Sequence, residues 1–153
     1  MAQELTREGK LRPFGHDDGQ KIGDPRSYLW LDAKLEIKGS AAIAAWVKRR
    51  NDNHWYSSHR GRLDFAISRN GWIRTTVELE PGTGAGDIES VAMECVDLRD
   101  PRASGSSPPG ECVVQVQQGF FLDANYVPGR SLVQPSAAAR LRVGEMTSVP
   151  LAH

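Results

Sequence analysis

The densest group of potentially reactive side chains lies at positions 53–60, in the run Asn-His-Trp-Tyr-Ser-Ser-His-Arg. Its histidines, His54 and His59, are five residues apart, which would put them on opposite faces of a strand. They can converge only if the segment is a loop, and the Asn and Asp residues before it and Gly61 after it favour a loop. Either imidazole could then exchange protons with a carboxylate such as Asp64. The alternative is that both histidines are exposed and carry no chemistry.

Other signals for catalysis or for a bound group are weak. The two histidines have no third ligand at a helical or strand spacing, and Ser57 and Ser58 lack the Gly-x-Ser-x-Gly turn of a hydrolase nucleophile. The carboxylate turn at 16–19 lacks the ligand spacing of a calcium loop. The glycine-rich run 82–86 has neither the lysine nor the helix of a phosphate site. We therefore expect no metal and no cofactor.

The large aromatic side chains predict a binding surface. Along residues 28–38, leucine, alanine and isoleucine alternate with charged and aromatic residues, as in a strand with one apolar face. Trp30 falls in the charged phase of this strand. Rings exposed among charged residues could stack on a sugar, on a flat organic ligand or on a partner protein, unless a second layer covers them. The expected ligand-binding residues are Trp30, Trp55, Tyr56, Trp72 and Arg74.

The elements that must position these residues are strands. Gly and Pro leave runs of 8 to 12 residues between them, a spacing typical of an all-β domain. Besides 28–38, strands are expected at 88–98, 112–123 and 139–149. Residues 41–50 are ambiguous, because their alanines favour a short helix, whereas the Gly-Ser dipeptide before them favours a strand that returns in a hairpin. We favour the strand.

This pattern predicts a single-domain antiparallel β-sandwich or small β-barrel of about seven to eight strands. Residues 1–27 are expected to form an irregular arm with a short strand near 11–14, and residues 28–153 the all-β domain.

The dipeptide Asn70-Gly71 predicts a hairpin over residues 60–80. A three-residue loop with Gly71 in the left-handed conformation places Ile67 opposite Ile73 and keeps the apolar residues on one face. The same register pairs Arg62 with Glu78, which have opposite charges.

Cys95 and Cys112 are the two cysteines of the chain. If they lie opposite each other on adjacent strands, Met93 also faces Val114, so one register satisfies both a disulfide and the apolar pattern. A bridge closing this loop would stabilise the fold by about 3 kcal/mol. It would also indicate a secreted or extracytoplasmic location, although the opening residues lack the apolar stretch of a signal peptide. The alternative is two buried free thiols.

Charge and hydropathy narrow the choice of partners. The chain has 19 basic and 19 acidic residues, so we do not expect nucleic-acid binding, and no apolar run approaches the length of a membrane span. Basic residues concentrate in 48–74 and acidic ones in 78–100, which could steer an anionic group or join copies into a homo-oligomer.

These features favour non-catalytic binding of a small molecule, a glycan or a protein. A small β-barrel hydrolase or cyclase with histidine acid–base catalysis, and a structural assembly subunit, are the alternatives.

Overall fold

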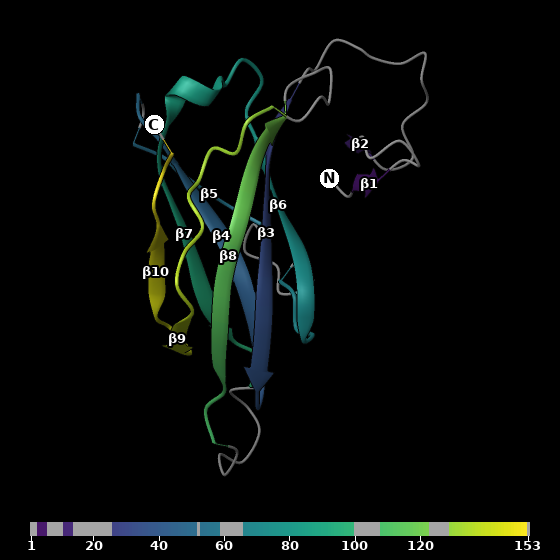
Figure 1. Ribbon diagram of the computed structural model, residues 1–153, viewed down its shortest axis with the longest axis vertical. Coiled ribbons are helices and arrows are strands. Elements are labelled where there is room, and N and C mark those ends of the chain that lie inside the picture. Colours follow the sequence, from purple (N-terminus) through teal and green to yellow (C-terminus); the bar gives the residue numbers. More distant parts are fainter. Residues whose placement is uncertain are drawn as a thin grey trace.

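The protein forms a β-sandwich, seen in a computed structural model that describes residues 3–5, 11–13, 26–51, 53–58, 66–99, 108–122 and 129–152. Two four-stranded antiparallel sheets pack face to face (Figure 1). This arrangement confirms the expected all-β class and selects the sandwich, since neither sheet closes into a barrel.

The first sheet, called the β3 sheet, has the strand order β6–β3–β8–β9, and the second, called the β4 sheet, has the order β10–β7–β4–β5. The strands of the β3 sheet are β6 (Gly71–Leu79), β3 (Ser27–Lys38), β8 (Glu111–Leu122) and β9 (Ala139–Arg142). Those of the β4 sheet are β10 (Met146–Val149), β7 (Ile88–Asp97), β4 (Ala41–Arg49) and β5 (Trp55–Ser57). The short helix η2 (Ala85–Asp87) precedes β7.

Near the N-terminus, β1 (Gln3–Leu5) pairs with β2 (Leu11–Pro13) in a separate two-stranded sheet. The strand expected near 11–14 is therefore present, and its partner is another segment of the arm. Within the described residues, no helix has the length and hydropathy that crossing a membrane requires.

The core lies between the sheets and follows from strand alternation. Leu29, Leu31 and Leu35 of β3 point inward and are fully buried, as are Ile43 and Val47 of β4. Residues 41–49 form a strand, so the alternative of a helix is wrong. Packing in the sandwich overrides the helix preference of the alanines, which are themselves buried on both faces of β4.

Two expected hairpins are wrong because each turn connects different sheets. Gly39, with φ +71°, leads from β3 into β4 across the end of the sandwich, so these strands are not neighbours in one sheet. Gly71 has the expected positive φ, +107°, but β6 pairs with β3 over nine residues, and residues 66–70, the described part of the segment before the turn, form no ladder with β6. Ile67 instead forms a bridge with Ile43 of β4.

The nine-residue pairing of β6 with β3 explains why Ile67 does not lie opposite Ile73. It places Val77 of β6 opposite Leu29, so that both enter the main core. The Glu78 carboxylate accepts a hydrogen bond from Arg26 Nη1 at 2.9 Å. Its expected partner, Arg62, lies outside the described residues.

The last expected strand is split into two. A turn at Gly144, with φ +90°, separates β9 from β10, and the two strands belong to different sheets. Glycine tolerates this backbone conformation, which strains other residues.

The two cysteines lie in opposite sheets and not on adjacent strands. Cys95 on β7 and Cys112 on β8 face each other across the core, fully buried, with their sulfur atoms 2.6 Å apart. Both are free cysteines, so the expected disulfide is not formed. Burial raises the pKa of both thiols. The location that was inferred from a bridge stays a prediction.

Candidate binding face on the β3 sheet

The outer face of the β3 sheet presents two neighbouring rows of polar and aromatic side chains, here called the β3 outer face. Each row takes one residue from β6, one from β3 and one from β8. The first row is Trp72, Lys34 and Gln115, and the second is Arg74, Asp32 and Gln118. Successive outward residues along a strand are about 6.5 Å apart, so the rows form one continuous surface.

A β-bulge completes the second row. The pairing of β3 with β8 shifts between Asp32 and Ala33, which lie opposite Gln118 and Val116. Gln117 is therefore the extra residue in β8. Without the shift, Gln117 would stand opposite Asp32, so the bulge brings the Gln118 amide to this carboxylate.

Arg74 is held in a fixed orientation by two contacts. Its Nε and Nη2 donate hydrogen bonds to Asp32 Oδ1 and Oδ2 at 2.6 and 2.9 Å. Its guanidinium carbon lies 3.9 Å from the centroid of the Trp30 ring. A bidentate ion pair and a stacked ring restrict a side chain that is otherwise flexible. Arg74 is thus preorganised for hydrogen bonding.

Asp32 is the centre of this network. Gln118 Nε2 donates a further hydrogen bond to Asp32 Oδ2 at 2.8 Å. Burial raises the pKa of the Asp32 carboxyl, but the hydrogen bonds from Arg74 and Gln118 and the charge of Arg74 outweigh it, so that the pKa falls below its usual value. Asp32 is therefore ionised at neutral pH and neutralises Arg74.

Trp30 lies on the outer face, as its phase in the strand predicted, but it is only 2% exposed. It forms a small cluster with Tyr28 and Leu122, separate from the core between the sheets. Its Nε1 is buried and has no hydrogen-bond partner within the described part of the chain. This position makes Trp30 a support for the Arg74 guanidinium and not a surface on which a ligand could stack.

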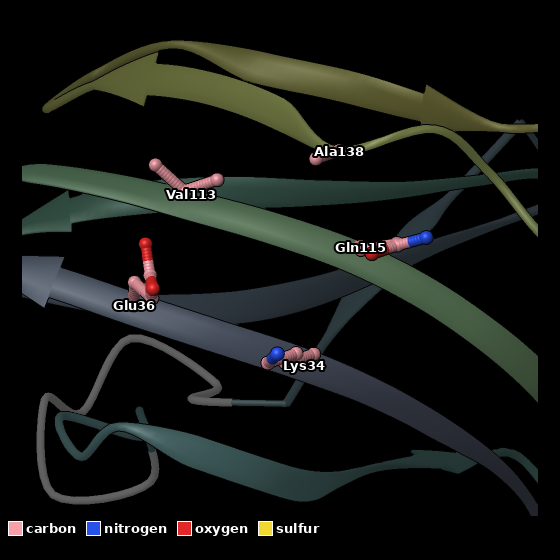
Figure 2. A pocket seen from close by; sticks show the side chains of 5 residues that line it. All are labelled: Lys34, Glu36, Val113, Gln115 and Ala138. Atoms are coloured by element: carbon pink, nitrogen blue, oxygen red, sulfur yellow. The ribbon is translucent and has the colours of Figure 1, made fainter.

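Trp72 is the most exposed large hydrophobic residue among those described, with 61% of its surface accessible. On the other side of Lys34, a shallow groove runs between β3, β8 and the segment before β9 (Figure 2). Its volume is about 160 Å³, and it is lined by Lys34, Glu36, Val113, Gln115 and Ala138. The ring of Trp72 and this polar groove therefore flank the same lysine.

The other two expected ligand-binding residues, Trp55 and Tyr56, lie in the β4 sheet. Residues 55–57 form the edge strand β5 and not a loop. The side chains of Trp55 and Tyr56, which are adjacent in this strand, therefore point to opposite faces of the sheet. Trp55 is 40% exposed, whereas Tyr56 packs against the core with its ring centroid 4.6 Å from that of His54. The five expected ligand-binding residues therefore do not converge: Trp30, Trp72 and Arg74 share one sheet, and Trp55 and Tyr56 belong to the other.

The expected catalytic group is not assembled in the described residues. His54 is exposed just before β5, and both His59 and Asp64 lie outside the described residues. Among the residues that the structure describes, no group of three or more His, Cys, Asp or Glu side chains could hold a metal ion.

Several residues of the face were missed by the sequence analysis although a signal was present. Lys34 and Asp32 share the outward phase of Trp30. On the β4 sheet, Trp46 was missed in the same way, since it is outward in β4 by the argument that places Ile43 inward. The outward direction of Gln118 was not predictable from strand alternation, because the bulge in β8 changes which residues of this strand face outward.

The basic side chains that could have steered an anion are largely paired. Lys48 Nζ lies 3.0 Å from Glu89 Oε2, and Arg74 binds Asp32. Arg50 Nη2 donates to the carbonyl oxygen of Ile88 at 3.4 Å.

No model of a protein family matches the chain, and no curated protein has a matching sequence.

Proposed function

We propose that the protein is a non-catalytic binding module whose β3 outer face takes a neutral, saccharide-like ligand. The observation that carries this proposal is the exposed Trp72 ring beside an immobilised row of hydrogen-bonding groups. A pyranose has an apolar face that can stack on an indole and a rim of hydroxyl groups that can bond to planar amides and guanidinium groups.

The state of Arg74 supports a neutral ligand over an anion. Asp32 neutralises its charge through two hydrogen bonds, while Nη1 has no hydrogen bond to a described residue and remains able to donate. Lys34 and Glu36, which line the groove, have opposite charges. The β3 outer face thus offers hydrogen-bond donors and acceptors, and its positive and negative charges balance each other.

The dimensions of the groove support a ligand that lies on the sheet. Pockets that enclose a small molecule usually measure 300–1,000 Å³, and this groove has about 160 Å³. A ring stacked on Trp72 would keep one side exposed and extend its hydroxyl groups toward Lys34 and Gln115. The expected acid–base residue His54 lies just before β5, the edge strand of the other sheet, which favours binding over catalysis at this face.

The test is a glycan-binding screen followed by affinity measurements on two tryptophan variants. Trp72→Ala should weaken binding of the selected saccharide roughly 3- to 10-fold or more, as expected for the loss of an aromatic stacking contact. Trp55→Ala, which removes an exposed ring from the other sheet, is the matched control and should bind as the wild type does. Equal affinities for wild type and Trp72→Ala would refute the proposed face.

A further inference from the structure

The groove beside Lys34 combines apolar and polar walls. Two of its lining side chains, Val113 of β8 and Ala138 of the segment before β9, are apolar (Figure 2). The other three, Lys34, Glu36 and Gln115, are polar. Because its volume of about 160 Å³ is well below that of pockets that enclose a whole small molecule, the groove suits one substituent of a larger ligand.

The polar side chains of the groove are open to a ligand. Lys34, Glu36 and Gln115 are exposed, and none of these three side chains makes a hydrogen bond or an ion pair within the described part of the chain. An ammonium group and an amide N–H can donate hydrogen bonds, and a carboxylate and an amide oxygen can accept them. The groove therefore offers donors and acceptors beside an apolar wall.

The two charges of the groove argue against an ionic substituent. Lys34 and Glu36 are two residues apart on β3, so both point outward about 6.5 Å from each other. A carboxylate in the groove would be repelled by Glu36, and an ammonium group would be repelled by Lys34. A neutral substituent that donates one hydrogen bond and accepts another can use both side chains.

The spacing of the strands connects the groove to Trp72. Trp72 of β6 lies opposite Lys34 of β3, which in turn lies opposite Gln115 of β8. Neighbouring strands are about 4.8 Å apart, so the groove begins one strand beyond the tryptophan. A pyranose ring stacked on Trp72 would therefore direct a substituent on its edge across Lys34 into the groove.

We propose, resting on the saccharide site proposed above, that the ligand carries an acetamido group, as N-acetylglucosamine does, and that this group occupies the groove. The methyl group would pack against Val113 and Ala138. The N–H would donate to the Glu36 carboxylate, and the carbonyl oxygen would accept from Lys34 and Gln115. Each part of the substituent thus meets a side chain of matching chemistry.

The decisive comparison uses the methyl glycosides of N-acetylglucosamine and glucose, titrated into the full chain and followed through the indole N–H signals. The two sugars differ only in carrying an acetamido or a hydroxyl group at one carbon, so the ratio of their affinities isolates the groove. We expect the acetamido sugar to bind roughly 5- to 50-fold more tightly, the gain from one buried methyl group and from additional hydrogen bonds. Equal affinities would overturn the proposal.

Variants of exposed residues locate the acetamido group. Ala138→Phe places a ring in the groove and should remove most of the preference for the acetamido sugar, while the affinity for the glucoside stays unchanged. Ala137→Phe, at an exposed neighbour that does not line the groove, is the matched control and should keep the preference. Glu36→Gln retains the shape of the acceptor but removes its charge, and should reduce the preference as well. A full preference in Ala138→Phe would contradict the assignment.

The outcomes separate this inference from the proposed function. Equal binding of both sugars that is lost in Trp72→Ala would support the saccharide site and refute the groove assignment alone. If neither sugar binds saturably, the inference fails, while the saccharide site is still judged by the effect of Trp72→Ala on the ligand from the glycan screen. A preference that is lost in Ala138→Phe but kept in Trp72→Ala would support the groove and refute stacking on Trp72.

Discussion

The ion pair between Asp32 and Arg74 should contribute measurably to stability, and Asp32→Asn tests it. The side chain of Asp32 is 15% exposed and that of Arg74 35% exposed. Exposed pairs contribute about 0.2–1 kcal/mol, and breaking a buried pair costs about 3–5 kcal/mol. This partly buried, bidentate pair lies between these limits, so Asp32→Asn should lower the free energy of unfolding by about 1–3 kcal/mol. For a chain of this length, that loss corresponds to a fall in Tm of roughly 3–10 °C.

The assay is urea unfolding followed by circular dichroism, in a double-mutant cycle with Arg74→Met. Methionine keeps an unbranched stem over Trp30 but removes the guanidinium. We expect a coupling energy of about 1–2 kcal/mol between the two positions. The exposed pair of Arg140 and Glu111, at 3.2 Å, is the control, and Glu111→Gln should cost less than about 1 kcal/mol. A coupling below about 0.3 kcal/mol would refute the view that Asp32 fixes Arg74.

The pH dependence of the same variant follows from the lowered pKa of Asp32. Because its folded-state pKa is below the unfolded value of about 3.9, ionised Asp32 stabilises the fold above that pH. This stabilisation is lost as the pH falls through the folded-state pKa. The stability difference between wild type and Asp32→Asn should therefore be constant between about pH 5 and 7 and should shrink below about pH 4.

Two further predictions concern the interior. The buried thiols Cys95 and Cys112, whose pKa values are raised, should react slowly with a disulfide reagent in the native protein and rapidly in urea; immediate labelling of native protein would contradict their burial. Gly110→Ala should destabilise the fold by about 1–3 kcal/mol, because a Cβ there would lie 2.7 Å from Ala41 Cβ and 2.9 Å from backbone atoms. Gly129→Ala meets no atom within 4 Å and is the control, and equal stability of the two variants would refute this packing argument.

Strand alternation was sufficient to predict β3 and the direction of its side chains, whereas the strand β5 and the division of residues 139–149 into β9 and β10 were not predicted. The inward leucines of β3 and the outward Trp30 both follow from a period of two. The strand at 41–49 was predicted correctly, but from a Gly-Ser hairpin that the structure does not form, because β3 and β4 belong to different sheets.

The assignment of strands to sheets could not be read from local sequence. A turn with Asn-Gly or Gly-Ser has the same local chemistry whether the next strand pairs with the previous one or crosses to another sheet. Ile67 and Gly71 illustrate this point, because the first belongs with β4 and the second begins β6. Local sequence also does not show which outward residues are buried by other parts of the protein. Trp30 and Trp72 share the outward phase, but Trp30 is buried and Trp72 is exposed.

The candidate site was predictable in part for the same reasons. Trp72 and Arg74 are two residues apart on one strand, which places both on one face. The partner of Arg74 on the neighbouring strand depends on register, and the contact of Gln118 depends on a bulge. Both are set by long-range pairing.

The most direct test of the proposed function is a saccharide titration followed through the indole N–H signals of the four tryptophans in nitrogen-15 spectra. A ligand from the glycan screen should shift the Trp72 signal progressively and leave the Trp55 signal in place. A shift confined to Trp55, with Trp72 unchanged at saturation, would contradict the assignment of ligand binding to the β3 outer face.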